Sequence, residues 1–339
     1  MVKKGKINVA IIGGFGDVGK KRKKYIQENK NFNLVAISDI RFKKNFIRNK
    51  IHYIKNYEDI FKINKNLDCV FITLPNYLSA KVTIKALSRK IHVFCEKPPA
   101  KNYTELLKVK KYLKKGLKLK YGFNHRYHGS IKMTKNIIES KKLGNVLNIR
   151  GLYGKSRILT YTKTDWRSKK KFAGGGILTD QGIHILDLIN FFCGKFTDYK
   201  SFISNKFWKY DVEDDAFAIL KNKNTIASIH STALQWEHKF RLEISLERGA
   251  IMLNGILSGS KTYGKERIQI LEKSGKKFKK MNFFYKKDNS WKEEVDEFAN
   301  IVKNNSSVKT GNLTDALNVM KMIDKIYKND KEWKKKWMT

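Results

Sequence analysis

The stretch INVAIIGGFGDVG, residues Ile7–Gly19, decides the fold of the first third of the chain. Its first six residues are apolar except for Asn8, which is typical of a strand buried on both faces of a parallel sheet. GxGxxG spacing follows over Gly14–Gly19, and a helical pattern continues over Lys20–Asn29. A strand, a glycine loop and a helix in this order predict the start of a βαβ unit that binds a dinucleotide.

The glycines of this loop have separate expected roles. Gly14 permits the tight turn, Gly16 lets the main chain approach a pyrophosphate, and Gly19 lets the helix pack close to the strand. The helix start then offers N–H groups and a positive dipole to the phosphates. A glycine turn without a ligand is the alternative. We expect the cofactor to contact Gly14, Phe15, Gly16, Asp17, Val18 and Gly19.

Asp39 ends the second apolar strand, Phe32–Ser38, 20 residues after Gly19. A carboxylate there can accept hydrogen bonds from the adenosine ribose and repels a 2′-phosphate, which favours NAD. Arg41 leaves NADP open, because an arginine beyond the strand can pair with that phosphate. We expect both residues to bind the cofactor.

Further along, apolar runs alternate with helical patterns up to about residue 125, which predicts a doubly wound parallel sheet. The later part is richer in consecutive strands, which predicts a large, mainly antiparallel sheet. We therefore expect an α/β protein with a Rossmann domain over residues 1–125 and an α/β domain with an open sheet over residues 126–339. A C-terminal helix is expected to pack back on the first domain. The antiparallel strands are expected at Tyr199–Asn205, Ala216–Leu220, Thr225–Ser231, Phe240–Glu247, Ile251–Leu253 and Ile268–Glu272.

Lys97 stands in Glu96-Lys97-Pro98-Pro99, directly after the predicted strand Ile91–Cys95. Ligands bind at the carboxyl ends of strands in open α/β sheets, so an ammonium group there can hold a substrate hydroxyl or stabilise an alkoxide. A solvated surface lysine is the alternative reading. Two prolines stiffen the turn, and a cis peptide before Pro98 is an option.

Asp180 and His184 lie four residues apart in a predicted helix over Ile177–Phe192, so they share one face. A carboxylate beside a histidine suits proton transfer near neutral pH. A capping aspartate and a structural histidine are the alternative. Gly182 within the helix costs roughly 1 kcal/mol relative to alanine, which indicates a close approach there.

The composition excludes several classes of protein. The net charge is +41, from 72 basic and 31 acidic residues, but lysine is spread along the chain and forms no large block. We attribute the charge to compositional drift, although it also favours anionic substrates, and we expect neither nucleic acid nor a membrane as partner. The cysteines at positions 69, 95 and 193 form no CxxC, so we expect no metal. Unpaired cysteines suit a reducing compartment, so we expect a cytoplasmic location.

Together the motifs resemble the Gfo/Idh/MocA family, the relatives of glucose–fructose oxidoreductase and inositol dehydrogenase. The likeness spans nearly the whole chain. It is carried by Gly14–Gly19, Pro75-Asn76, Glu96-Lys97-Pro98, Phe123-Asn124-His125-Arg126, Trp166-Arg167 and the run from Gly174 to Asp187, GGGILTDQGIHILD. One departure is Ser79, where many relatives carry histidine.

The resemblance implies an NAD(P)-dependent oxidoreductase that acts on a CH–OH group of a sugar or nucleotide sugar. It implies that Lys97 polarises the reacting hydroxyl, that His184 exchanges its proton, and that Asp180 orients the substrate. Further cofactor contacts are expected from Thr73, Leu74, Pro75, Asn76, Glu96, Lys97 and Asn124. Substrate contacts are expected from Lys97, Asn124, Arg126, Tyr153, Trp166, Arg167, Asp180 and His184.

The resemblance also implies a homo-dimer or homo-tetramer formed through the C-terminal sheet. Trp208–Phe217 and Gln235–Lys239 resemble members that handle sugars for surface polysaccharides. Basic and aromatic residues that precede Trp166 are candidates for contact with an acidic sugar, or the result of drift: Lys155, Arg157, Tyr161 and Lys163. Alternatives for the whole protein are a redox-neutral, NAD-dependent glycosidase-type member and a non-catalytic dinucleotide-binding protein.

Overall fold

The computed structural model describes residues 5–63, 66–159, 165–258 and 263–338. The chain forms two compact units. The first comprises Met1–Asn124 and Ser290–Leu317, and the second comprises His125–Asn289 and Asn318–Thr339. We expected the division at residue 125 and the return of a C-terminal helix to the first domain. The segment that returns is Ser290–Leu317, which is followed by the rest of the last long helix.

Among the described residues, the sheet of the first unit has seven strands in the order β3-β4-β2-β1-β5-β6-β7. All neighbours are parallel except β3 and β4. Strands β1, β5 and β6 consist mostly of buried apolar residues, as parallel strands covered on both faces do. The strands are β1 (Ile7–Ile12), β2 (Phe32–Ser38), β3 (Phe46–Arg48), β4 (Ile51–Ile54), β5 (Cys69–Ile72), β6 (His92–Glu96) and β7 (Leu119–Gly122).

Helices from both ends of the sequence complete this unit. Helix α8 belongs to the returning segment, and its residues Val295, Phe298, Ala299 and Val302 join the apolar core of β1, β2, β5 and β6. Phe298 contacts Phe71 and Phe94 edge to face, with ring centroids 5.6 and 5.5 Å apart. The helices are α1 (Asp17–Glu28), α2 (Ile60–Ile63), α3 (Asn76–Ser88), α4 (Tyr103–Val109) and α8 (Ser290–Lys303).

The second unit is built on an eight-stranded sheet, counted over the described residues, in the order β15-β14-β13-β12-β8-β11-β10-β9. Neighbours are antiparallel except β8 and β11. The predicted fold class, a parallel sheet followed by a large, mainly antiparallel one, is confirmed. The strands are β8 (Val146–Ser156), β9 (Asp198–Ser204), β10 (Asp215–Lys221), β11 (Ile226–Gln235), β12 (Lys239–Leu246), β13 (Gly249–Asn254), β14 (Glu266–Ser274) and β15 (Lys277–Tyr285).

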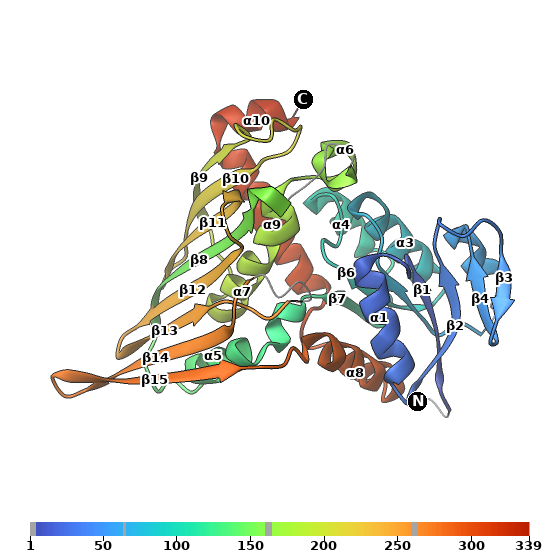
Figure 1. The fold of residues 1–339 in the computed structure, drawn as a ribbon, viewed down its shortest axis with the longest axis horizontal. Coiled ribbons are helices and arrows are strands. Elements are labelled where there is room, and N and C mark those ends of the chain that lie inside the picture. The colour runs from blue at the N-terminus through green and yellow to red at the C-terminus, as the bar shows by residue number, and fades with distance from the viewer. Residues whose placement is uncertain (1–4, 64–65, 160–164, 259–262, 339) are drawn as a thin grey trace. The chain divides into compact units, whose positions relative to one another are not determined.

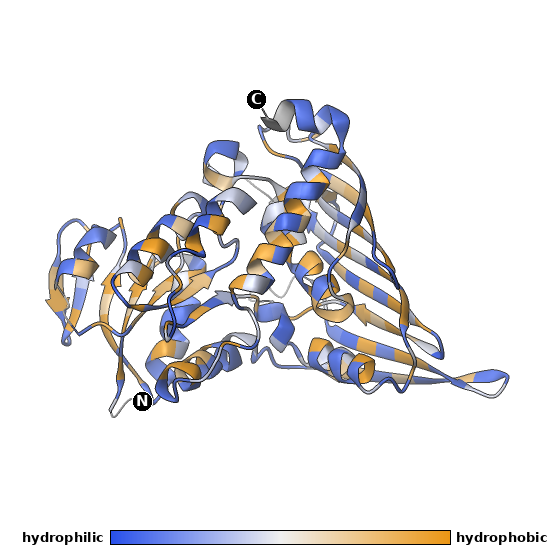
Figure 2. Cartoon of the chain, turned by 180° about the vertical axis from the view of Figure 1, so that it is seen from behind, coloured by the Kyte–Doolittle hydropathy of each residue, from blue (hydrophilic) through white to orange (hydrophobic). Residues whose placement is uncertain are grey.

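Helices of the second unit lie along one face of its sheet, as Figure 1 shows. Helix α7 packs on β8 and β11, and α5 packs on β14 and β15. Hydrophobic and hydrophilic residues alternate along several strands of this sheet (Figure 2). The opposite face nevertheless carries exposed apolar side chains such as Phe202, Phe217 and Ile219. The helices are α5 (Gly129–Glu139), α6 (Lys170–Ala173), α7 (Ile183–Cys193), α9 (Leu313–Asn329, whose first residues belong to the first unit) and α10 (Lys331–Met338).

The structure departs from the sequence-based expectations in a few elements. Helix α1 begins at Asp17, three residues before the expected start. Strands β3, β4 and β15 were not expected. Cys69 and Cys95 are buried and unbridged. Within the described residues, no helix combines the length and the apolar character needed to cross a bilayer.

Candidate active site

The glycine loop between β1 and α1 is shaped by close packing of the main chain. Gly13 has φ +87°, and a Cβ there would lie 2.9 Å from the Thr73 hydroxyl. A Cβ on Gly14 would lie 2.6 Å from Ile37 Cγ2, and one on Gly19 would overlap the Gly13 carbonyl oxygen. Larger residues at these positions would push the strand, the loop and the helix apart. The loop has the compact form that a dinucleotide requires.

Gly16 is different because it faces open space. Within the described residues, a Cβ added there would meet only the Gly13 carbonyl oxygen, at 3.7 Å. Gly16 is also the N-cap of α1, and no side chain accepts a hydrogen bond at this helix start. The first N–H groups of α1 and the helix dipole are therefore available to an anion. This cradle fits a pyrophosphate, with Phe15, Asp17 and Val18 beside it.

Asp39 stands at the end of β2 and closes the adjacent side of the loop. Its Oδ2 accepts a hydrogen bond from the Phe15 N–H at 2.9 Å. The Arg41 guanidinium donates to both carboxylate oxygens, at 2.8 and 3.1 Å. Burial raises the pKa of Asp39, but the bonds from Arg41 and Phe15 outweigh burial and hold the pKa below its usual value. The carboxylate is ionised, and Arg41 offsets part of its charge.

The ends of β5 and β6 contribute to the same edge of the sheet. Thr73 donates from its hydroxyl to the carbonyls of Ile12 and Gly13, both at 2.9 Å, and Asn76 is buried at the start of α3 after Leu74 and Pro75. Lys97 follows β6, is half-buried, and precedes a cis Lys97–Pro98 peptide. The first unit thus gathers the glycine loop, Asp39, the Pro75-Asn76 turn and Lys97 at its strand ends.

Glu96 is held by a fully buried arginine that sequence reasoning did not find. Arg22 of α1 bonds Glu96 Oε1 through Nε at 2.6 Å and Glu294 Oε2 through NH2 at 2.5 Å. Its guanidinium also lies 4.5 and 4.4 Å from the ring centroids of Phe94 and Trp291. Arg22 therefore ties the helix after the glycine loop to the residue before Lys97. A basic run, Lys20–Lys24, conceals it in the sequence.

In the second unit, His184 is buried and stacked on another histidine. The rings of His125 and His184 lie 3.7 Å apart between centroids, at 14°. His125 Nε2 is 3.2 Å from the hydroxyl of Tyr153. Burial, aided by the charge of Asp180, raises the pKa of Tyr153 well above its ordinary value, so the phenol stays protonated. His125 lies within a quoted motif, yet its neighbours Asn124 and Arg126 were the ones expected at the substrate.

Asp180 lies among positive charges. Lys155 Nζ is 3.5 Å from its Oδ2, and Arg167 Nε is 3.9 Å from its Oδ1. Gln181 donates to Oδ2 at 2.9 Å. Trp166 stacks beneath the Arg167 guanidinium, whose carbon is 4.5 Å from the ring centroid. The second unit therefore brings together Asp180, Lys155 and Arg167, whereas Tyr161 and Lys163 lie outside the described residues.

Arg126 and Asn124 each have hydrogen-bond partners within the chain. Arg126 is buried and forms a bidentate pair with Asp187 at 2.8 and 2.6 Å. Asn124 donates to the Ser290 hydroxyl at 3.1 Å. Since Asp187 lies one turn after His184, Arg126 fixes α7 near the histidine. Contact of Asn124 or Arg126 with a substrate stays a prediction.

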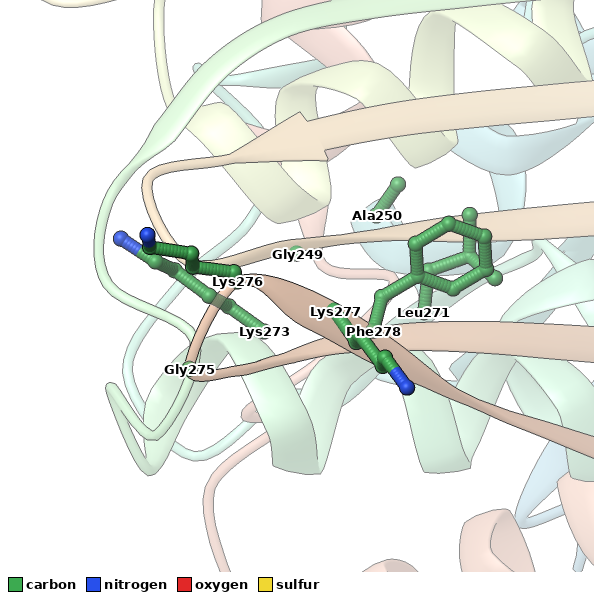
Figure 3. Close-up of a pocket in the computed structure, with 8 residues that line it drawn as sticks. All are labelled: Gly249, Ala250, Leu271, Lys273, Gly275, Lys276, Lys277 and Phe278. Carbon is green, nitrogen blue, oxygen red and sulfur yellow. The ribbon is translucent and has the colours of Figure 1, made fainter.

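A surface cavity of about 580 Å³ lies at the end of the β14–β15 hairpin, away from these groups. Leu271 and Phe278 form part of its floor, and Lys273, Lys276 and Lys277 surround it (Figure 3). None of its lining residues was expected in the site. The cavity therefore contributes nothing to the candidate active site.

Two family models match the chain. One, described as an oxidoreductase family with an NAD-binding Rossmann fold, matches residues 7–123, and the other, a GFO/IDH/MocA C-terminal domain, matches residues 131–252. Glucose-6-phosphate 3-dehydrogenase of Bacillus subtilis is 28% identical over 53% of this chain and 52% of its own. Myo-inositol 2-dehydrogenase of Thermotoga maritima is 24% identical over 74% of this chain and 75% of its own.

The match covers about half the length of the first of these relatives. Among solved structures, levoglucosan dehydrogenase in complex with NADH has a TM-score of 0.83 at 19% identity, with 97% of this chain and 98% of that chain covered. A 3-ketoreductase from Actinomadura kijaniata, a mutant in complex with NADP and TDP-benzene, has a TM-score of 0.81 at 17% identity, with 96% and 98% covered. At these identities the structural likeness concerns the fold alone.

Proposed function

Because the chain belongs to the Gfo/Idh/MocA family of oxidoreductases, we propose that it transfers a hydride between a nicotinamide dinucleotide and a hydroxyl or keto carbon of a sugar or nucleotide sugar. The resemblance inferred from the motifs is confirmed by the two family models. The observation that carries the proposal is the open helix start at Gly16 on the same strand-end edge as Lys97. A sugar phosphate and a cyclitol are the substrates in the names of two of the relatives.

The nicotinamide, when bound, supplies the site that accepts or gives the hydride. Lys97 binds the reacting oxygen through its ammonium group and favours the alkoxide character that develops there. His184 takes the hydroxyl proton during oxidation and returns it during reduction. Asp180 orients the substrate hydroxyls, and Lys155 and Arg167 hold Asp180 in place. In the direction of oxidation, one hydride and one proton leave the CH–OH group, and a ketone remains.

The first test is a direct assay of binding and turnover. Calorimetric titration with NAD⁺ and NADP⁺ measures cofactor affinity, and absorbance of the reduced cofactor measures turnover of glucose 6-phosphate, levoglucosan and myo-inositol. We expect Lys97→Ala and His184→Ala to lose about 10²- to 10⁴-fold in kcat, and His184→Ala to keep its cofactor affinity. Lys101→Ala is a matched control, because Lys101 lies on the same turn but pairs with Glu105 at 3.1 Å.

The outcomes separate the alternatives. Turnover without net reduced cofactor would indicate redox-neutral chemistry, and cofactor binding without turnover of any sugar would indicate a non-catalytic binding protein. Failure to bind either dinucleotide would overturn the proposal as a whole.

We further propose that the open face of the large sheet joins copies of the chain into a homo-dimer or homo-tetramer. Phe202 and Ile219 are 79% and 55% exposed on neighbouring strands, which leaves apolar area for a partner to cover. Light scattering on a sizing column should give a multiple of the chain mass. Phe202→Lys should reduce that mass, and a monomeric wild type would refute the idea.

A further inference from the structure

The segment that carries Asp180 and His184 begins without a local cap. Three glycines, Gly174–Gly176, precede it, and its N-cap residue Ile177 has no side chain that can accept a hydrogen bond. The first N–H groups of a buried helix need acceptors, which are normally supplied by Ser, Thr, Asp or Asn at the N-cap. The acceptors therefore have to come from elsewhere in the chain.

Glu213 supplies them. Its Oε2 accepts a hydrogen bond from the Gly176 N–H at 2.7 Å, and its Oε1 accepts one from the Leu178 N–H at 2.9 Å. Its main-chain carbonyl accepts from the Ile177 N–H at 3.2 Å. One residue thus satisfies three successive N–H groups. Glu213 is 1% exposed, so water does not compete for these bonds.

Close packing and a second residue hold Glu213 itself. A Cβ on Gly176 would overlap the Glu213 carbonyl oxygen, so no larger residue allows this approach. The Tyr327 hydroxyl donates to Glu213 Oε1 at 2.7 Å and lies 2.9 Å from the Thr179 hydroxyl. Helix α9 therefore contacts the same turn through Tyr327. The Glu213 carboxylate is hydrogen-bonded both to the start of the turn and to α9.

The turn that follows is wider than an α-helix. Leu178–Gly182 is π-helical, and α7 continues from Ile183. A π-turn is an uncommon conformation that is frequently found at functional sites. Asp180 lies in this π-turn and His184 lies in the first turn of α7, so the pair spans the junction of the two segments. The register of this turn depends on which N–H groups are bonded at its start.

We propose that Glu213 is a positioning residue, which sets the register of the π-turn and so places Asp180 and His184 for proton transfer. The inference rests on the proposed function, because it assigns the role of Glu213 through these two residues. Glu213 touches no reacting atom. Its contribution is to hold the start of the segment within the small tolerance that catalysis requires, where a misplacement of about 1 Å costs about 10²-fold in rate.

Glu213→Gln and Tyr327→Phe test the proposal. Glutamine keeps one acceptor oxygen but presents an amide N–H₂ to a main-chain N–H, so the start of the turn loses a bond. Phenylalanine removes a single donor. Asp330→Asn is the matched control, because Asp330 accepts from the N–H groups of Ile203 and Trp333 at 2.8 and 2.9 Å and caps α10 instead.

We expect Glu213→Gln to lower kcat about 10- to 100-fold per folded molecule, with Tyr327→Phe showing a smaller loss. The affinity for NAD⁺ should stay within about twofold of wild type, because cofactor residues lie in the other unit. A merely structural role predicts a lower melting temperature with unchanged kcat per folded molecule, and that result would overturn the proposal. Turnover is measured with the sugar of the panel that the wild type oxidises.

Hydrogen exchange measured by mass spectrometry provides an arm that needs no substrate. Glu213→Gln should accelerate exchange in peptides that cover residues 174–184, and Asp330→Asn should not. Unchanged exchange there would overturn the proposal even if the enzyme is active. Accelerated exchange with a wild type that oxidises no sugar would leave the positioning role supported and the proposed function refuted.

Discussion

Gly16 and Gly19 lie three residues apart in one loop, but alanine at each should have opposite consequences. At Gly16, φ is −67° and suits alanine, and the new methyl group meets only one atom of the described residues within 4 Å. The unfolding free energy should therefore change by less than about 1 kcal/mol. At Gly19, the methyl group would lie 2.9 Å from two main-chain atoms of Gly14 and overlap the Gly13 carbonyl. Main chain cannot rotate away, so a loss of about 1–3 kcal/mol is expected.

The cofactor affinity should show the reverse order. A methyl carbon needs about 3.5–4.0 Å from its neighbours, so at Gly16 it occupies the space where the pyrophosphate approaches the main chain. We expect the Kd for NAD⁺ to rise at least about tenfold in Gly16→Ala, which corresponds to about 1.4 kcal/mol.

Urea unfolding and calorimetric titration with NAD⁺ measure the two quantities separately. Wild-type affinity in Gly16→Ala, within about twofold, would refute the placement of the phosphates at this helix start. A Gly16→Ala protein that unfolds as readily as Gly19→Ala would refute the reading of open space at Gly16.

Three further predictions concern buried or paired charges. Arg41→Ala removes the counter-charge of Asp39, whose carboxylate repels a 2′-phosphate, so the Kd for NADP⁺ should rise about tenfold relative to that for NAD⁺. Equal changes in the Kd of both cofactors would contradict this prediction. Arg22→Met leaves buried carboxylates unpaired and should lower the unfolding free energy by about 3–5 kcal/mol. The double variant Arg22→Met/Glu294→Leu should restore part of this loss. Additive losses for the two substitutions in urea unfolding would argue against the pairing of Arg22 with Glu294. Burial raises the pKa of Glu213 from its ordinary 4.5 to about 7, so its folded-state pKa lies above its unfolded value. The stability advantage of wild type over Glu213→Gln should be present below about pH 4.5 and be lost as pH rises through about 7, by up to about 3 kcal/mol. Thermal melts of both proteins measure this difference in stability. A difference that grows with pH would exclude the raised pKa of Glu213 as its origin.

The fold was largely predictable because its main signals are local. Unbroken apolar runs mark the buried parallel strands, and alternation marks the strands of the second sheet. The hairpin of β3 and β4 escaped prediction because its turn is formed by Asn49 and Lys50, both at positive φ. A lysine there conceals the usual Asn-Gly signal. Strand β15 is exposed along most of its length and shows no apolar alternation.

The candidate site could be predicted only where its residues lie in motifs. The glycine loop, Lys97, Asp180 and His184 are separated by fixed short spacings from turns or helix starts. Glu213 reaches Gly176 across 37 residues and meets Tyr327 across 114, so no spacing rule connects them. Arg22 reaches Glu294 across 272 residues for the same reason. Such contacts depend on how distant elements pack, which a single sequence does not specify.

The return of α8 to the first unit bears on how the chain folds during synthesis. Val295 and Phe298 belong to the same apolar core as Ile7 and Phe71, although almost 300 residues separate the ends of this set. A nascent chain that has emerged only to Asn124 has all seven strands of the first sheet, yet it exposes the surface that α8 later covers. The ribosome must therefore deliver residues 125–289, most of the second unit, before the first unit can close. Until then that surface is open to chaperones and to aggregation.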